Sequence, residues 1–175
     1  VYLADQAVDG QFELWCVPLD ASAPPRRLND VLIPEGDVSE FAVDPTGTWA
    51  LYLADALHAE QRGLYAVPLD GSAPAHELLA REYPDAYLDI GRFVVTPDGA
   101  RVAFLAAGVG TTFFSPNSFV LYAAPLDGSA PAQNLHSLDS YLPNWDLRLT
   151  PDGTRAVYRL QAPGSFYRDR LDLFS

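Results

Sequence analysis

Apolar side chains recur at every second position in three stretches of the chain, and each stretch runs into a proline. A period of two residues is typical of a β-strand with one buried face, because a helix would repeat every 3.6 residues. The pattern therefore predicts strands that end at proline turns. The apolar pairs are Phe41 and Val43, Phe93 and Val95, and Leu147 and Leu149, followed by Pro45, Pro97 and Pro151.

Two turn signatures alternate along the chain. One occurs in segments 44–55 (DPTGTWALYLAD), 96–107 (TPDGARVAFLAA) and 150–161 (TPDGTRAVYRLQ). The other occurs in segments 15–24 (WCVPLDASAP), 65–74 (YAVPLDGSAP) and 122–131 (YAAPLDGSAP). Proline fixes φ in such turns, Asp bonds to nearby backbone, and Gly takes the left-handed conformation. Successive copies lie 50 to 57 residues apart, which indicates an internal repeat of that length.

Each repeat contains four short predicted strands. An aromatic residue occupies one register in the second strand, a third strand enters the Pro-Leu-Asp turn, and a leucine four residues after the closing proline marks the fourth. The aromatics are Tyr2, Tyr52, Phe104 and Tyr158; the third strands are 12–17, 63–67 and 119–124; the leucines are Leu28, Leu78 and Leu135.

Four antiparallel strands in a repeat of this length are typical of a β-propeller blade. We predict an all-β fold: a β-propeller of four-stranded antiparallel blades, about three and a half of which are present. The chain forms one propeller-type domain, 1–175. Its repeats are approximately 1–37 (partial), 38–87, 88–143 and 144–175 (partial).

The segments TPDGARVAFLA and LYAAPLDGSAP resemble the TolB-type β-propeller repeat. That family is shared with prolyl-oligopeptidase-like propellers and with bacterial repeat-bearing surface proteins. The resemblance implies a propeller fold over essentially the whole chain and a periplasmic, cell-surface or extracellular location. Propellers carry unrelated activities on one scaffold, so the resemblance names no activity.

The register of the repeats predicts an open ring. Segment 1–5 matches 51–55, in a second strand, and segment 171–175 matches a third strand. Closed propellers typically have four to eight blades. We therefore expect a protein partner: a second copy, a neighbouring chain or a missing remainder of the same protein completes the propeller.

Charge and composition narrow the classes of partner. The chain has 23 acidic and 11 basic side chains, a net charge of -12 and no Lys. An acidic surface repels phosphate backbones, so we expect no nucleic acid partner. The chain also lacks a run of the roughly 18 to 20 apolar residues that membrane insertion needs. The single cysteine, Cys16, excludes an intramolecular disulfide, and we predict that it is buried.

An acidic loop follows the first predicted strand. Asp5, Asp9 and Glu13 are carboxylates near Gly10, and oxygen ligands around a glycine turn suit calcium. The resemblance extends to repeats whose loop reads Asp-x-Asp-x-Asp-Gly, but Ala7 stands at the middle position here. Two interpretations stay open: a calcium site formed by Asp5, Asp9 and Glu13, or a plain hairpin with solvated acids. No other cofactor is expected.

The corresponding loop of the third repeat is longer and contains Phe113 and Phe114. Adjacent exposed aromatics are unfavourable in water unless something covers them. Either they pack beneath their own loop or they contact a partner.

No catalytic constellation is visible. The chain lacks a Gly-x-Ser-x-Gly elbow, and His58, His76 and His136 fall at unrelated repeat positions. We therefore expect no catalytic residue and no enzyme activity within this chain. The favoured function is a non-catalytic propeller module for protein binding or scaffolding in a larger bacterial protein or assembly. The alternative is the substrate-gating propeller of a prolyl-oligopeptidase-like serine peptidase. A third class, an enzyme with its site on the ring axis, would need inward-facing charged residues, whereas the repeated first-strand positions are apolar.

Overall fold

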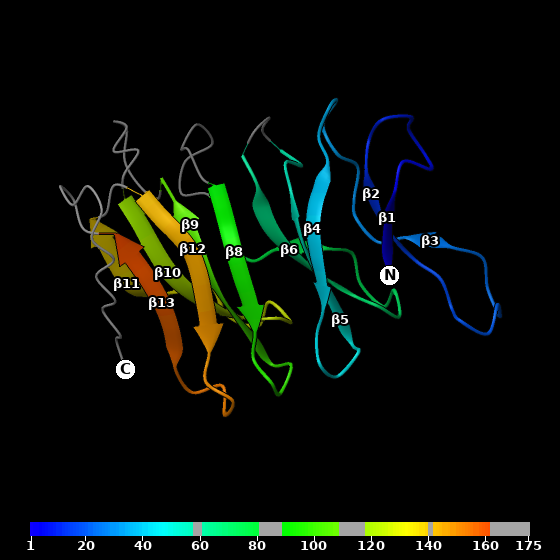
Figure 1. Cartoon of the computed structure of the whole chain (residues 1–175). Coiled ribbons are helices and arrows are strands. Elements are labelled where there is room, and N and C mark those ends of the chain that lie inside the picture. Colours follow the sequence, from blue (N-terminus) through cyan, green and yellow to red (C-terminus); the bar gives the residue numbers. More distant parts are fainter. Residues whose placement is uncertain (58–60, 81–88, 109–117, 140–141, 162–175) are drawn as a thin grey trace. The chain divides into compact units, whose positions relative to one another are not determined.

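The computed structural model describes residues 1–57, 61–80, 89–108, 118–139 and 142–161, and every regular element in these ranges is a β-strand (Figure 1). Four antiparallel sheets follow one another along the chain, with three, four, four and two strands. We call them blades 1 to 4 in chain order. The predicted all-β fold of four-stranded antiparallel blades is confirmed.

Blades 2 and 3 are complete four-stranded meanders, in which each strand pairs with the next along the chain. Blade 2 consists of β4 (Val38–Val43), β5 (Trp49–Ala54), β6 (Gly63–Pro68) and β7 (His76–Glu77). Blade 3 consists of β8 (Asp89–Val95), β9 (Arg101–Ala107), β10 (Ser118–Pro125) and β11 (Gln133–Asp139).

Blades 1 and 4 show fewer strands within the described residues. Tyr2 pairs with Trp15 in blade 1 as Tyr52 pairs with Tyr65 in blade 2, so the strands of blade 1 correspond to the second, third and fourth of a blade. Blade 1 consists of β1 (Tyr2–Ala4), β2 (Glu13–Cys16) and β3 (Arg26–Arg27), and blade 4 of β12 (Leu142–Leu149) and β13 (Ala156–Gln161).

The turns between the first and second strands adopt the conformation that their sequence predicts. The amides of Gly47, Gly99 and Gly153 donate to the carbonyl three residues earlier at 3.0, 2.9 and 2.8 Å. Their φ angles of 71°, 70° and 69° lie in the left-handed region, where a side chain would be strained. The same local sequence therefore forms the same turn in blades 2, 3 and 4.

Contacts divide the chain into two compact units, 1–79 with blades 1 and 2 and 80–175 with blades 3 and 4. The prediction of one domain stays a prediction. Within the described ranges there is no helix that could cross a membrane.

In each unit the core lies between two blades. In unit 1, Leu14 and Leu28 of blade 1 share a buried cluster with Tyr52 and Tyr65 of blade 2. The two tyrosine rings stack with centroids 5.2 Å apart. In unit 2, the corresponding cluster joins two leucines of blade 3, Leu105 and Leu121, to Leu147 and Tyr158 of blade 4. Burial of these side chains is the main force that holds each pair of blades together.

Three residues differ from the sequence-based expectation. Leu28 and Leu78 are buried, but Leu135 is 47% exposed. The register of β10 with β11 shifts between Leu121 and Tyr122, so Leu135 lies in a bulge instead of the core-facing position. Val43 is exposed at the end of β4, and Cys16 is half-buried.

Candidate functional site

The strand order determines which connections share an end of a blade. In an antiparallel meander, the first-to-second and third-to-fourth turns lie at one end. The second-to-third loop and the linker to the next blade lie at the other. In unit 1 the described segments of this second end are 5–12, 28–37, 55–57 and 61–62, opposite the turn between β4 and β5 (Figure 1). We call it the loop end of unit 1.

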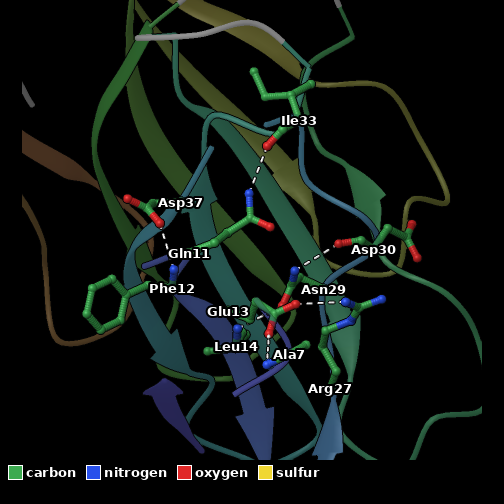
Figure 2. Close-up of polar contacts among 10 residues, drawn as sticks. All are labelled: Ala7, Gln11, Phe12, Glu13, Leu14, Arg27, Asn29, Asp30, Ile33 and Asp37. Carbon is green, nitrogen blue, oxygen red and sulfur yellow. Dashed lines mark hydrogen bonds and ion pairs between the residues drawn. The ribbon is translucent and has the colours of Figure 1, made fainter. Parts of the chain in front are cut away.

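Hydrogen bonds tie the loop-end segments of blades 1 and 2 together. The Gln11 side chain donates to the Ile33 carbonyl at 2.8 Å, and Asp37 accepts the Phe12 amide at 2.6 Å (Figure 2). The Asp37 amide in turn donates to the Asp55 carboxylate at 2.6 Å. Hydrogen bonds to ionised carboxylates are about twice as strong as neutral ones. We call these five residues the loop-end frame.

A tight turn fits the linker into this frame. The Gly36 amide donates to the Ile33 carbonyl at 3.0 Å. A Cβ on Gly36 would lie 2.6 Å from the Asp55 carbonyl oxygen, so only glycine allows the linker to pass so close to blade 2. Glu35, in the same turn, has a φ of 64°, an uncommon conformation for a residue other than glycine.

A carboxylate is buried beside the frame. Glu13 is 1% exposed, and one of its oxygens accepts a hydrogen bond from Arg27 at 2.7 Å. The other accepts the Ala7 amide at 3.2 Å (Figure 2). Removing one partner of a buried ion pair typically costs about 3–5 kcal/mol of stability. Because Arg27 is a third exposed, the loss here is expected toward the lower end.

Asn29 completes this polar layer. Its side-chain oxygen accepts the Leu14 amide at 2.7 Å, and its side-chain nitrogen donates to the Asp30 carbonyl at 2.8 Å (Figure 2). A buried polar group is stable only when it is hydrogen-bonded, and both ends of this amide are. The contacts hold the start of the linker against β2.

The predicted calcium ligands are not gathered into one site. Both oxygens of Glu13 are engaged by Arg27 and Ala7, and Asp5 accepts the Gly10 amide at 3.4 Å. In the part of the chain that the structure describes, no three His, Cys, Asp or Glu side chains converge as metal ligands would. Calcium binding by Asp5, Asp9 and Glu13 stays a prediction, and the geometry around Glu13 is that of a structural ion pair.

Four large apolar side chains lie exposed at the loop end of unit 1. Val8, Phe12, Val31 and Leu57 are between 46 and 79% exposed. Each belongs to the loop-end frame or lies within three residues of it. The Val8 carbonyl accepts a hydrogen bond from the Gln11 amide. Val31 and Leu57 lie two residues from Ile33 and Asp55, respectively. We call these four side chains the loop-end patch. They are held in place by a hydrogen-bonded backbone.

The surroundings of the patch are strongly acidic. Segments 5–12, 28–37, 55–57 and 61–62 carry six carboxylates and one basic side chain, Arg62. Four of the six side chains are exposed, and the other two belong to the frame. Fields of one sign over such a surface attract the opposite charge. The six are Asp5, Asp9, Asp30, Glu35, Asp37 and Asp55.

A groove of about 530 Å³ in unit 1 is lined by residues 26–30 and 71–74, so the first residues of the linker, 28–30, border it as well. The Arg26 side chain donates to the Leu69 carbonyl at 2.5 Å. It also covers Gly71 so closely that a Cβ there would lie 1.5 Å from Nη1. Through this hydrogen bond Arg26 links blade 1 to the third-to-fourth turn of blade 2.

The other residues that the sequence singled out lie either outside the described residues or on packed strands. Phe113 and Phe114, the predicted partner contacts, lie outside the described residues, as does His58. His76 lies on β7 with its ring edge-on to Trp49, at 5.8 Å between centroids. His136 lies on β11 and hydrogen-bonds the Tyr158 hydroxyl through Nδ1. These are contacts of packed side chains.

Sequence reasoning missed the frame, the patch and the Glu13–Arg27 pair. The ion pair connects residues on neighbouring strands, and it becomes visible only when the register of β2 and β3 is known. The patch did leave a signal, because Val8, Val31 and Leu57 are apolar residues in connections between strands.

Comparison with known proteins supports the fold. No family model matches the chain, and no curated protein matches its sequence. Two structures of puromycin hydrolase match with a TM-score of 0.53, at 20 and 19% identity, over 87 and 85% of this chain. A protein assigned as TolB from Agrobacterium tumefaciens matches with a TM-score of 0.47, at 20% identity, over 75% of this chain and 43% of its own.

The chain spans about a quarter of the puromycin hydrolase chains, 24% in both cases. At these identities the likeness concerns architecture. The resemblance to TolB-type propellers that the sequence predicted is confirmed by the structural matches at that level. The four sheets are those of a β-propeller.

Proposed function

We propose that this chain is a non-catalytic β-propeller module whose function is to bind protein, as a scaffold within a larger bacterial protein or assembly. The observation that supports the proposal is the loop-end patch. Phe12 and Val31 expose apolar surface while their backbone is fixed by the loop-end frame. The periplasmic or cell-surface location implied by the TolB-type resemblance belongs to the same proposal.

A patch of this kind is suited to binding protein for two reasons. Contiguous or clustered apolar side chains at a surface are unfavourable in water and mark interaction sites. Side chains on a fixed backbone also lose little conformational freedom when a partner binds, so more of the contact energy appears as affinity.

Selection from an unbiased random 12-residue peptide library on the immobilised chain tests this function. We expect enriched peptides whose affinity falls when Phe12 and Val31 are both replaced by serine. The matched control is Leu19→Ser, because Leu19 is a fully exposed apolar residue at the opposite end of unit 1. Failure to enrich any peptide over a surface without the chain would contradict the proposal.

A second candidate function is the substrate-gating propeller of a larger serine peptidase. It is supported by the two puromycin hydrolase structures, which match most of this chain and have TM-scores above 0.5. Labelling of the native protein that contains this chain with a fluorophosphonate probe tests it. Labelling supports the peptidase role, and absence of labelling with active hydrolase present as a positive control contradicts it.

A further inference from the structure

We infer that the loop-end patch of unit 1 docks a basic polypeptide segment, in which Lys or Arg side chains flank an apolar residue. This inference rests on the protein-binding function proposed above and specifies the chemistry of the partner. It follows from the juxtaposition of exposed apolar side chains with a rim of carboxylates at one end of the two blades.

The carboxylates around the loop-end patch determine the sign of the charge that the partner carries. Six carboxylates and one basic side chain, Arg62, lie in the described loop segments of this end, 5–12, 28–37, 55–57 and 61–62. Asp5, Asp9, Asp30 and Glu35 are exposed to solvent. A chain with a net charge of -12 adds a long-range field of the same sign. Nucleic acids and anionic lipid surfaces are repelled by this field, whereas a basic peptide is attracted.

The apolar side chains determine where such a segment is held. Charge pairs at the rim of an interface chiefly increase the association rate, whereas a buried apolar or aromatic contact slows dissociation. Phe12 is the aromatic of the patch, and its amide is held by Asp37. Val31 lies on the linker that Gln11 binds through Ile33. The partner therefore needs at least one apolar residue, which covers Phe12 or Val31.

The opposite end of unit 1 lacks this combination. Leu19 is exposed there, but the neighbouring Asp20 accepts the Ser22 amide at 3.0 Å within its own turn. Arg26 lies over the other turn of that end and supplies positive charge beside Asp70. Leu19 is thus an exposed apolar residue away from the carboxylates of the loop end, and it serves as the control position.

The test uses the full chain and two synthetic peptide libraries as probes. Both libraries have Leu or Phe at the central position and Gly or Ser elsewhere. They differ only in having Lys and Arg, or Asp and Glu, at four flanking positions. We expect the basic library to be enriched and the acidic library to give no enrichment. Binding of an enriched basic peptide should weaken about tenfold between 50 and 500 mM NaCl, because salt screens charges at the surface.

Substitutions separate the two parts of the inference. Phe12→Ser with Val31→Ser should weaken the enriched peptide about tenfold, as expected for loss of anchor contacts, and Leu19→Ser less than twofold. Asp30→Asn with Glu35→Gln should weaken it about fivefold at low salt and much less at high salt. Circular dichroism melting of each variant checks that the fold is retained, which we expect because all five substituted side chains are exposed.

The outcomes distinguish this inference from the proposed function. If the unbiased library yields binders but the basic and acidic libraries are enriched equally, the protein-binding function stands and the inference is wrong. The inference is also overturned if basic peptides bind with affinity unchanged by the Phe12 and Val31 substitutions. If no library yields a binder, the proposed function itself is contradicted.

Discussion

The Asp and Thr of the first-to-second turn exchange places between blades. In blade 2 the order is Asp44-Pro-Thr46-Gly, and in blade 3 it is Thr96-Pro-Asp98-Gly. The Thr hydroxyl donates to the Asp carboxylate in both orders. The exchange changes the burial of the carboxylate: Asp44 is 3% exposed at the end of its strand, whereas Asp98 is exposed at the tip of the turn.

Asp44 links the stability of blade 2 to pH. Burial raises the pKa of Asp44, but hydrogen bonds from Thr46, Trp49 and Thr48 outweigh it and hold the pKa below its ordinary value. The amides of Thr48 and Trp49 donate to it at 2.7 and 2.6 Å. A carboxyl whose pKa is lower in the folded state stabilises the fold above its unfolded pKa of about 3.9, and this stabilisation is lost as pH falls through the folded pKa.

We expect Asp44→Asn to lower the free energy of unfolding at pH 7 by about 1–3 kcal/mol, since buried amides lose a charged acceptor. The difference from wild type should shrink as the pH falls below about 4. Urea denaturation at pH 7 and pH 3 measures it. Asp98→Asn, at the exposed tip, is the control and should cost less. An equal cost of Asp44→Asn at both pH values would contradict the linkage.

Arg26 and Gly71 show how one blade is fastened to the next. The Pro-Leu-Asp turn needs a left-handed residue after Asp, and φ is 56° at Ala21, 77° at Gly71 and 67° at Gly128. Ala21 shows that the turn tolerates a Cβ in blade 1. In blade 2 a Cβ would meet Arg26 as well. Gly71 is therefore required both by the left-handed φ of the turn and by the Arg26 side chain that lies over it.

Gly71→Ala should therefore destabilise the protein more than Gly47→Ala, whose added Cβ would meet nothing within 4 Å. We expect an excess of about 1 kcal/mol, because Arg26 must move and lose its hydrogen bond to Leu69. Arg26→Ala should remove the excess, so a double-mutant cycle by chemical denaturation checks it. Additive effects of the two substitutions would show that Arg26 does not cover Gly71 in solution.

The elements were largely predictable from the sequence, whereas their contacts were not. Period-two patterns and Pro-Gly turn chemistry are local, so they located the strands of blades 2 and 3 and the turns at Pro45 and Pro68. The position of Leu135 could not be predicted by counting from Pro131, because the bulge beside Tyr122 depends on pairing with β10. The loop-end frame was hidden for the same reason: Asp37 and Phe12 are 25 residues apart.

At the scale of the molecule, each of the two units has its own layer of core between its two blades. Leu14 of blade 1 and Leu147 of blade 4 are both fully buried, but in different clusters. In a repeat protein, stability is approximately a sum of repeat and nearest-neighbour terms. A cavity in one layer is therefore expected to affect that layer most.

We expect Leu14→Ala to cost about 2–5 kcal/mol, the usual range for a buried leucine, with the loss concentrated in unit 1. Hydrogen exchange measured by mass spectrometry checks this. Protection should fall in peptides from blades 1 and 2 and be largely kept in blades 3 and 4. Leu147→Ala is the matched control, and it should reduce protection in blades 3 and 4 and leave blades 1 and 2 largely protected. Equal loss of protection in all four blades would mean that the chain unfolds as a single cooperative body.

The two faces of a blade are unlike, and this gives the array a direction. Within each unit, a leucine of the earlier blade (Leu14, or Leu105) shares a buried cluster with a tyrosine of the later one (Tyr52, or Tyr158). Contacts between unlike faces are heterologous and propagate head to tail. Each blade therefore has two different faces, one for the preceding blade and one for the following blade. Duplicating residues 38–87 in tandem should extend the array in register, whereas reversing the order of faces would bring leucine against leucine and tyrosine against tyrosine.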